Sequence, residues 1–120
     1  FPPPQIEKDK SQLHDYVKIA SRIACELGAD AIKTFYSGDR FPEVVAGTPI
    51  PIFTLGAEKM ETELQALDLA HRSIRDGARG VVFGRNVFQA KDPAAFLKGL
   101  KAVVKEGAKP KDAAAKFGLH

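Results

Sequence analysis

The chain has 120 residues, of which 44% are hydrophobic and 28% are charged, with a formal net charge of +3. This length suffices for one domain with one core, and the composition excludes an intrinsically disordered protein. No apolar run approaches the ~20 residues of a membrane span, and the first residues show no secretory signal, so no membrane partner is predicted.

Residues 1–10 are rich in proline and then in charge, which predicts a loop. A helix is predicted from Ser11, a good N-cap, to Gly28, because apolar residues recur at helical spacing between them. Residues 31–36 are typical of a buried strand, and residues 37–40 interrupt it.

The alternation of helix and strand continues along the rest of the chain. The predicted elements are a short helix over 42–46, a strand over 50–55, a helix over 61–76, a strand over 80–83, a turn or short helix over 86–89, and a helix capped by Asp92 and ended by Gly107. We therefore expect one partial domain over 1–120, with a loop over 1–10, α/β units over 11–107 and a tail over 108–120.

Short apolar strands that alternate with helices predict an α/β fold with a parallel sheet. Two helix-to-strand joints, 27–32 and 76–81, resemble each other and suggest a degenerate internal repeat. Three strands alone would leave both sheet edges unpaired, so we expect further strands from a missing N-terminal part or from a partner chain. About five more strands would close a (β/α)8 barrel, and two or three would complete an open doubly wound sheet.

Lys33 is the unusual residue of the first predicted strand, because lysine is rarely buried without a partner. Strand alternation places Lys33 and Phe35 on one face, and Ile32, Thr34 and Tyr36 on the other. Its amine could reach water from a strand end. Alternatively, apolar surroundings could keep the amine uncharged, so that it attacks a carbonyl and forms a Schiff base.

Glycine follows the second and third predicted strands, in Gly56-Ala57 and Gly84-Arg85-Asn86. Glycine lets the backbone approach a ligand, and Arg85 could add positive charge, which together suit an anion such as a phosphate. These residues could also be plain turn glycines beside a surface arginine. Because the carboxyl ends of parallel strands meet at one edge, we expect both segments to lie near Lys33.

Other kinds of site have weaker support in the sequence. His14, His71 and His120 show no metal-site spacing, and the chain contains no dinucleotide-binding or Walker motif, so neither metal nor cofactor is predicted. The lysines near the C-terminus predict a solvated helix face and not a nucleic-acid site, since only Phe117 is near them. The single Cys25 predicts a reducing, cytoplasmic setting. Because the chain begins with Phe1, we expect it to be processed or to be a piece of a longer protein.

Three segments carry a resemblance to a known family. The sequence resembles the last third of the class I (Schiff-base) aldolases of the DeoC/LacD/FbaB group, which includes the archaeal-type fructose-bisphosphate aldolases and LsrF-like thiolases. The resemblance extends in order from about residue 17 to 104. The segments are Ile32-Lys33-Thr34-Phe35-Tyr36, Val45-Ala46-Gly47-Thr48-Pro49-Ile50-Pro51-Ile52 and Gly84-Arg85-Asn86-Val87-Phe88-Gln89.

The resemblance implies a carbon–carbon lyase or transferase that acts on a phosphorylated sugar or keto substrate. It implies strands six to eight of a (β/α)8 barrel, a Schiff-base lysine at Lys33, and a phosphate site at Gly56, Ala57, Gly84 and Arg85. It also implies a homo-oligomer. The family usually has two glycines where this chain has Gly56-Ala57. Its proton-transfer residues come from earlier strands, so we expect the fragment alone to be nearly inactive.

Two other interpretations remain open from the sequence. One is a non-catalytic α/β module that serves anion binding or assembly. The other is an open-sheet domain like those of phosphosugar isomerases, which would bind its ligand without a covalent imine.

Overall fold

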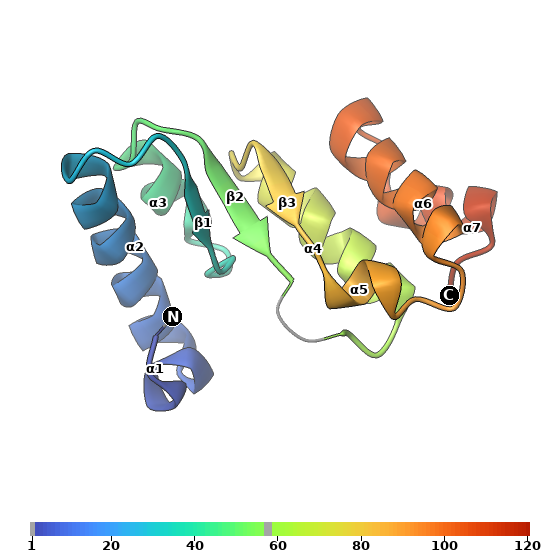
Figure 1. Ribbon diagram of the computed structural model, residues 1–120, viewed down its shortest axis with the longest axis horizontal. Helices are drawn as coiled ribbons and strands as arrows, with labels where there is room; N and C mark the ends of the chain where they lie inside the picture. The colour runs from blue at the N-terminus through green and yellow to red at the C-terminus, as the bar shows by residue number, and fades with distance from the viewer. Residues whose placement is uncertain (1, 57–58) are drawn as a thin grey trace.

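A computed structural model describes residues 2–56 and 59–120 of the chain (Figure 1). Helices and strands alternate along most of the chain, as predicted. The elements are α1 (Pro4–Lys8), α2 (Lys10–Glu26), β1 (Ile32–Thr34), α3 (Phe41–Ala46), β2 (Ile52–Leu55), α4 (Glu63–Arg75), β3 (Gly80–Val82), α5 (Arg85–Phe88), α6 (Pro93–Glu106) and α7 (Pro110–Phe117).

The three strands form one parallel sheet in the order β1-β2-β3. Lys33 of β1 lies opposite Phe53 of β2, and Leu55 of β2 lies opposite Val82 of β3. Side chains alternate between the faces of a strand, so this register assigns Lys33, Phe53 and Val82 to the same face. The predicted parallel sheet is confirmed.

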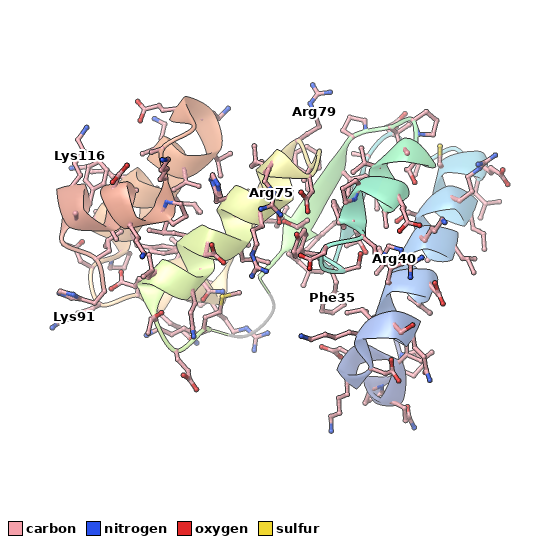
Figure 2. The ribbon with its side chains drawn as sticks, turned by 180° about the vertical axis from the view of Figure 1, so that it is seen from behind. Phe35, Arg40, Arg75, Arg79, Lys91 and Lys116 are labelled. Carbon is pink, nitrogen blue, oxygen red and sulfur yellow. The ribbon has the colours of Figure 1, made fainter. Side chains whose placement is uncertain are left out.

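The helices that pack on the sheet lie on the opposite face. Ile32 and Ile52 share a buried cluster with Val17 of α2 and Val44 of α3. On the same face, the Thr54 hydroxyl donates a 2.9 Å hydrogen bond to Ser73 of α4. Figure 1 shows the strands in front of α3 and α4, and Figure 2 shows the same two helices in front when the molecule is seen from behind. Helices on one face only are typical of a barrel wall, whereas a doubly wound sheet carries helices on both faces.

A second core lies beyond β3, between α4, α6 and α7. Phe96 of α6 is completely buried in it, together with Leu67 of α4 and Leu119 near the C-terminus. The Asp92 carboxylate accepts a 3.1 Å hydrogen bond from Ala95 N, which confirms Asp92 as the cap of α6. This core holds α6 and α7 against the sheet-covering helix α4.

The two similar helix-to-strand joints adopt the same conformation. Gly28 and Gly77 both have a positive φ, +99° and +110°, which glycine adopts without strain. The next residue in each joint donates back into the preceding helix, with Ala29 N to Ala24 O at 3.1 Å and Ala78 N to Ser73 O at 2.9 Å. This is the helix-ending pattern of a Schellman motif, and it confirms the predicted repeat of an α-turn-β unit.

The predicted loop over residues 1–10 is wrong in part, because it contains α1 and the start of α2. Pro4 begins α1, where its missing N–H costs nothing because the first turn has no acceptor for it. The cap of α2 is Asp9 and not Ser11, since the Asp9 carboxylate accepts from Ser11 N at 3.0 Å and Gln12 N at 3.1 Å. A carboxylate two residues upstream therefore takes the capping role predicted for the serine hydroxyl.

The buried face of α2 is rotated from the one that the apolar spacing predicts. His14, Val17 and Ser21 are buried, whereas Ile23 is exposed and Leu27 is 83% exposed. Ile23 and Leu27 mark a largely exposed side at the C-terminal end of α2.

The described residues contain no helix that is both long and apolar enough to cross a membrane.

Candidate active site at the carboxyl ends of the strands

The carboxyl ends of all three strands meet at one edge of the sheet. In Figure 1 the arrowheads point to this edge, where the chain after β1 turns back and where α5 follows β3. Phe35, which follows the Lys33 strand, lies at the same edge in Figure 2. The sequence-based expectation that these segments converge is thus met by the fold.

Lys33 is exposed in this structure. Its neighbours in the strand, Ile32 and Thr34, belong to the helix-covered face, so Lys33 lies on the face that the packed helices leave uncovered. The expectation that apolar surroundings keep its amine dry is therefore wrong for this chain taken alone. The physical reason is that three strands form only an arc, which cannot enclose the face they line.

Tyr36 fixes one side of the segment that follows β1. Its hydroxyl donates a 2.6 Å hydrogen bond to the Asp76 carboxylate, and its ring centroid lies 5.2 Å from that of Phe41. Arg72 of α4 stacks over the same ring at 5.6 Å. These partners lie on the helix side of the sheet, which confirms that Tyr36 points away from Lys33.

The Tyr36–Asp76 pair has shifted proton affinities. Burial and the hydrogen bond to Asp76 raise the pKa of Tyr36 from 10.0 to about 12. Burial alone would raise the pKa of Asp76, but hydrogen bonds from Arg75 and Tyr36 and the nearby arginine charges outweigh it, so that pKa is lowered. In the folded chain Asp76 therefore stays ionised and Tyr36 stays neutral near neutral pH.

We expect the Tyr36 hydroxyl to titrate about two pH units above an ordinary tyrosine. Because folding raises the pKa of Tyr36, the protonated Tyr36 hydroxyl contributes to the free energy of unfolding. This contribution is complete below pH 10 and is lost as the pH rises through about 12. The chain has two tyrosines, so a Tyr16→Phe variant leaves Tyr36 as the only reporter. Near-ultraviolet absorbance of tyrosinate measures the midpoint, and a midpoint near 10 in the folded variant would contradict the expectation.

His14 fixes the other side of the same segment. The His14 ring is 2% exposed, and its Nδ1 shares a 2.9 Å hydrogen bond with the Ser37 hydroxyl. Its Nε2 lies 3.7 Å from the Glu43 carboxylate, which also pairs with Arg40 at 2.7 Å. The chain that leaves the Lys33 strand is thus tied to α2 through Ser37 and to α4 through Tyr36. Sequence reasoning took His14 for a lone histidine and missed this role.

The glycine segments predicted to bind an anion also lie at this edge. Gly56 directly follows β2 and is buried, whereas Gly84 and Arg85 are exposed where α5 begins. Ala57 lies outside the described residues. Asn86 connects the two segments, because its Oδ1 accepts from Met60 N at 2.8 Å and its Nδ2 donates to Gly56 O at 3.5 Å. Among the described residues, no group of three or more His, Cys, Asp or Glu side chains could hold a metal ion.

Comparison with known proteins identifies the family of the chain. The sequence profile of the DeoC/LacD family aldolases matches residues 2–90, which is most of the chain. The chain belongs to the DeoC/LacD aldolase family. The class I aldolase group recognised from the three sequence segments is thereby confirmed.

Known relatives of this DeoC/LacD family chain are longer enzymes. It is 42% identical over 99 residues to a 3-hydroxy-5-phosphonooxypentane-2,4-dione thiolase of Salmonella typhimurium, covering 82% of this chain and 34% of that protein. It is 41% identical over 114 residues to the thiolase of the same name from Yersinia pestis, covering 95% of this chain and 38% of that protein. The chain thus spans little more than a third of the length of the curated relatives it matches.

Solved structures of aldolases share the fold of this DeoC/LacD family chain. A crystal structure of an archaeal fructose 1,6-bisphosphate aldolase matches it with a TM-score of 0.71 and 38% identity, over 75% of this chain and 37% of that one. A structure of a Schiff-base-forming fructose-1,6-bisphosphate aldolase matches with the same TM-score and identity. Together with the one-sided parallel sheet, these matches confirm three βα units of a partial (β/α)8 barrel.

Proposed function

We propose that this chain is the part of a class I aldolase that carries the Schiff-base lysine, Lys33. The proposal rests mainly on one observation. Lys33 is the only charged residue in the three strands, and it lies on the sheet face that helices leave uncovered. It is close to the edge of the sheet where the active sites of α/β barrels lie. A solved relative is described with its catalytic lysine covalently bound to the carbinolamine intermediate of its substrate, which supports the same chemistry here.

The reaction follows from the chemistry of a primary amine. The neutral Lys33 amine adds to the ketone carbonyl of the substrate, and water leaves to give an iminium. A base then takes the proton of the hydroxyl on the β-carbon, and the bond between the α- and β-carbons breaks. The β-carbon leaves as an aldehyde, and the iminium takes up the electron pair of that bond to become an enamine. Protonation of the enamine and hydrolysis return the amine. The reverse sequence forms the bond.

The proposed substrate is a phosphorylated sugar or keto compound. The backbone at Gly56 and Gly84 would approach the phosphate, Arg85 would add charge, and Ala57 is included in the same proposed site. Relatives named for a phosphonooxy compound and for fructose 1,6-bisphosphate support a phosphorylated substrate.

The exposure of Lys33 indicates that further strands are needed to enclose the proposed site. A dry amine requires the remaining barrel strands, either from an N-terminal part or from a partner chain, and these would also supply the proton-transfer residue. We further propose a cytoplasmic homo-oligomer. The same exposure favours a second candidate function for the chain acting alone, namely a non-catalytic module for anion binding or assembly.

Trapping of the imine tests the proposal. The protein at its natural length is incubated with dihydroxyacetone phosphate, reduced with borohydride, and mapped by mass spectrometry. We expect a reduced adduct on Lys33, and little adduct when the 120-residue chain is treated alone. An adduct on another lysine, or none in a folded natural-length protein, would favour the non-catalytic module.

A further inference from the structure

Asn86 is a buried amide that joins two segments far apart in the sequence. It lies on α5, after β3, and is 4% exposed. Both ends of its amide group reach the segment after β2, with Oδ1 accepting from Met60 N at 2.8 Å and Nδ2 facing Gly56 O at 3.5 Å. A buried amide needs such partners, because an unpaired buried polar group loses its hydrogen bonds to water without replacement.

The absence of a side chain at Gly56 leaves room for the Asn86 side chain. A Cβ placed on Gly56 would lie 2.8 Å from Asn86 Nδ2 and 2.9 Å from the Phe83 ring, both closer than real Cβ contacts. The methyl group of an alanine would therefore push the two segments apart. The glycine at this position is explained by the close approach of Asn86 and Phe83, in addition to any role toward a ligand.

We propose that Asn86 is a positioning residue that sets the spacing between Gly56 and the Gly84-Arg85 segment, which both belong to the proposed phosphate site. This inference rests on the proposed phosphate site described above. Asn86 follows Gly84 and Arg85 directly in the chain and bonds to the backbone beside Gly56. One side chain thus holds both halves of the site at a fixed separation, and that separation decides whether one phosphate group can contact both.

Asparagine suits this role because its amide donates and accepts at once. Aspartate would keep an acceptor for Met60 N but would turn a second oxygen toward Gly56 O, and the added negative charge would oppose a phosphate. Alanine would remove both bonds without adding charge. Asn86→Ala is therefore the cleaner variant.

The test measures phosphate binding apart from imine formation. Calorimetry with inorganic phosphate on the natural-length protein should show a dissociation constant roughly 10- to 100-fold weaker in Asn86→Ala, since the loss of about one hydrogen bond to a charged group changes affinity by that factor. Gln89→Ala, which removes an exposed amide from the end of the same helix, should bind phosphate as the wild type does. Borohydride trapping of Lys33 with unphosphorylated dihydroxyacetone should be unchanged in both variants.

A second variant keeps the test decisive if Asn86→Ala does not fold. Asn86→Gln keeps the amide on a side chain one methylene longer, so it should shift Gly84-Arg85 relative to Gly56 and show the same loss for phosphate and the same unchanged trapping with dihydroxyacetone. The proposal is overturned if the folded variants bind phosphate like the wild type, if both measurements fall together, or if the wild type binds no phosphate. Failure of the wild type to trap dihydroxyacetone on Lys33 would instead overturn the proposed imine chemistry.

Discussion

Replacing Lys33 with methionine in the natural-length protein is expected to abolish the trapped adduct and to lower kcat by roughly 10³-fold or more. Enzymes typically accelerate reactions by about 10⁶-fold or more, and a covalent mechanism loses its central step when the nucleophile is removed. Methionine keeps the length of the side chain while it removes the amine. Activity close to that of the wild type would show that another group carries the chemistry.

The Lys33→Met variant should separate chemistry from folding. Lys33 is exposed within this chain and forms no ion pair with any residue in the ranges 2–56 and 59–120, so the free energy of unfolding of the 120-residue chain should change by only about 0.5 kcal/mol or less. Lys98→Met is a matched control, because Lys98 is also exposed but lies on α6, away from the strand ends. It should leave adduct formation and kcat unchanged. Steady-state kinetics and denaturant unfolding measure the two effects.

Replacing Phe41 with alanine is expected to destabilise the chain by about 3–5 kcal/mol. Phe41 begins α3, is completely buried with Ile32 and Ile52 of the sheet, and stacks against Tyr36. Its removal leaves a cavity where three elements meet. A domain of this size is commonly stable by only about 5–15 kcal/mol, so a large part of the population is expected to unfold in mild denaturant.

Phe88 provides a matched control for this change. It is 66% exposed on α5, so Phe88→Ala makes the same truncation without opening a cavity and should cost less than about 1 kcal/mol. Chemical denaturation followed by circular dichroism compares the two variants with the wild type. Equal shifts of the unfolding midpoint would mean that the core around Phe41 does not hold β1 in place.

The parts of the fold that local patterns encode were predictable from the sequence. Gly28 and Gly77 end their helices in the same left-handed conformation, because few other residues adopt it without strain. Asp92 and Pro93 start α6 as their chemistry requires. The apolar, β-rich character of residues 50–55 also predicted a buried parallel strand, and β2 forms over Ile52–Leu55 of that segment.

The parts that depend on tertiary contacts were not predictable in the same way. His14 is polar, so apolar spacing placed it outside the buried face of α2, yet its bond to Ser37 allows it to be buried. In the Gly84-Arg85-Asn86 motif, the sequence indicated a ligand-binding role only for the glycine and the arginine. The contact between Asn86 and Gly56 is visible only in the folded structure. The surroundings of Lys33 depend on residues that other strands would contribute, so the sequence pattern around Lys33 could not describe them.

The order β1-β2-β3 has a consequence for how such a protein is made. Both outer strands present backbone donors and acceptors, and these groups can pair with any other strand they meet. Until neighbouring units arrive, a newly synthesised chain is therefore open to pairing with another copy of itself. We expect chaperone dependence and strand exchange between copies to be the characteristic faults when this segment is refolded at high concentration.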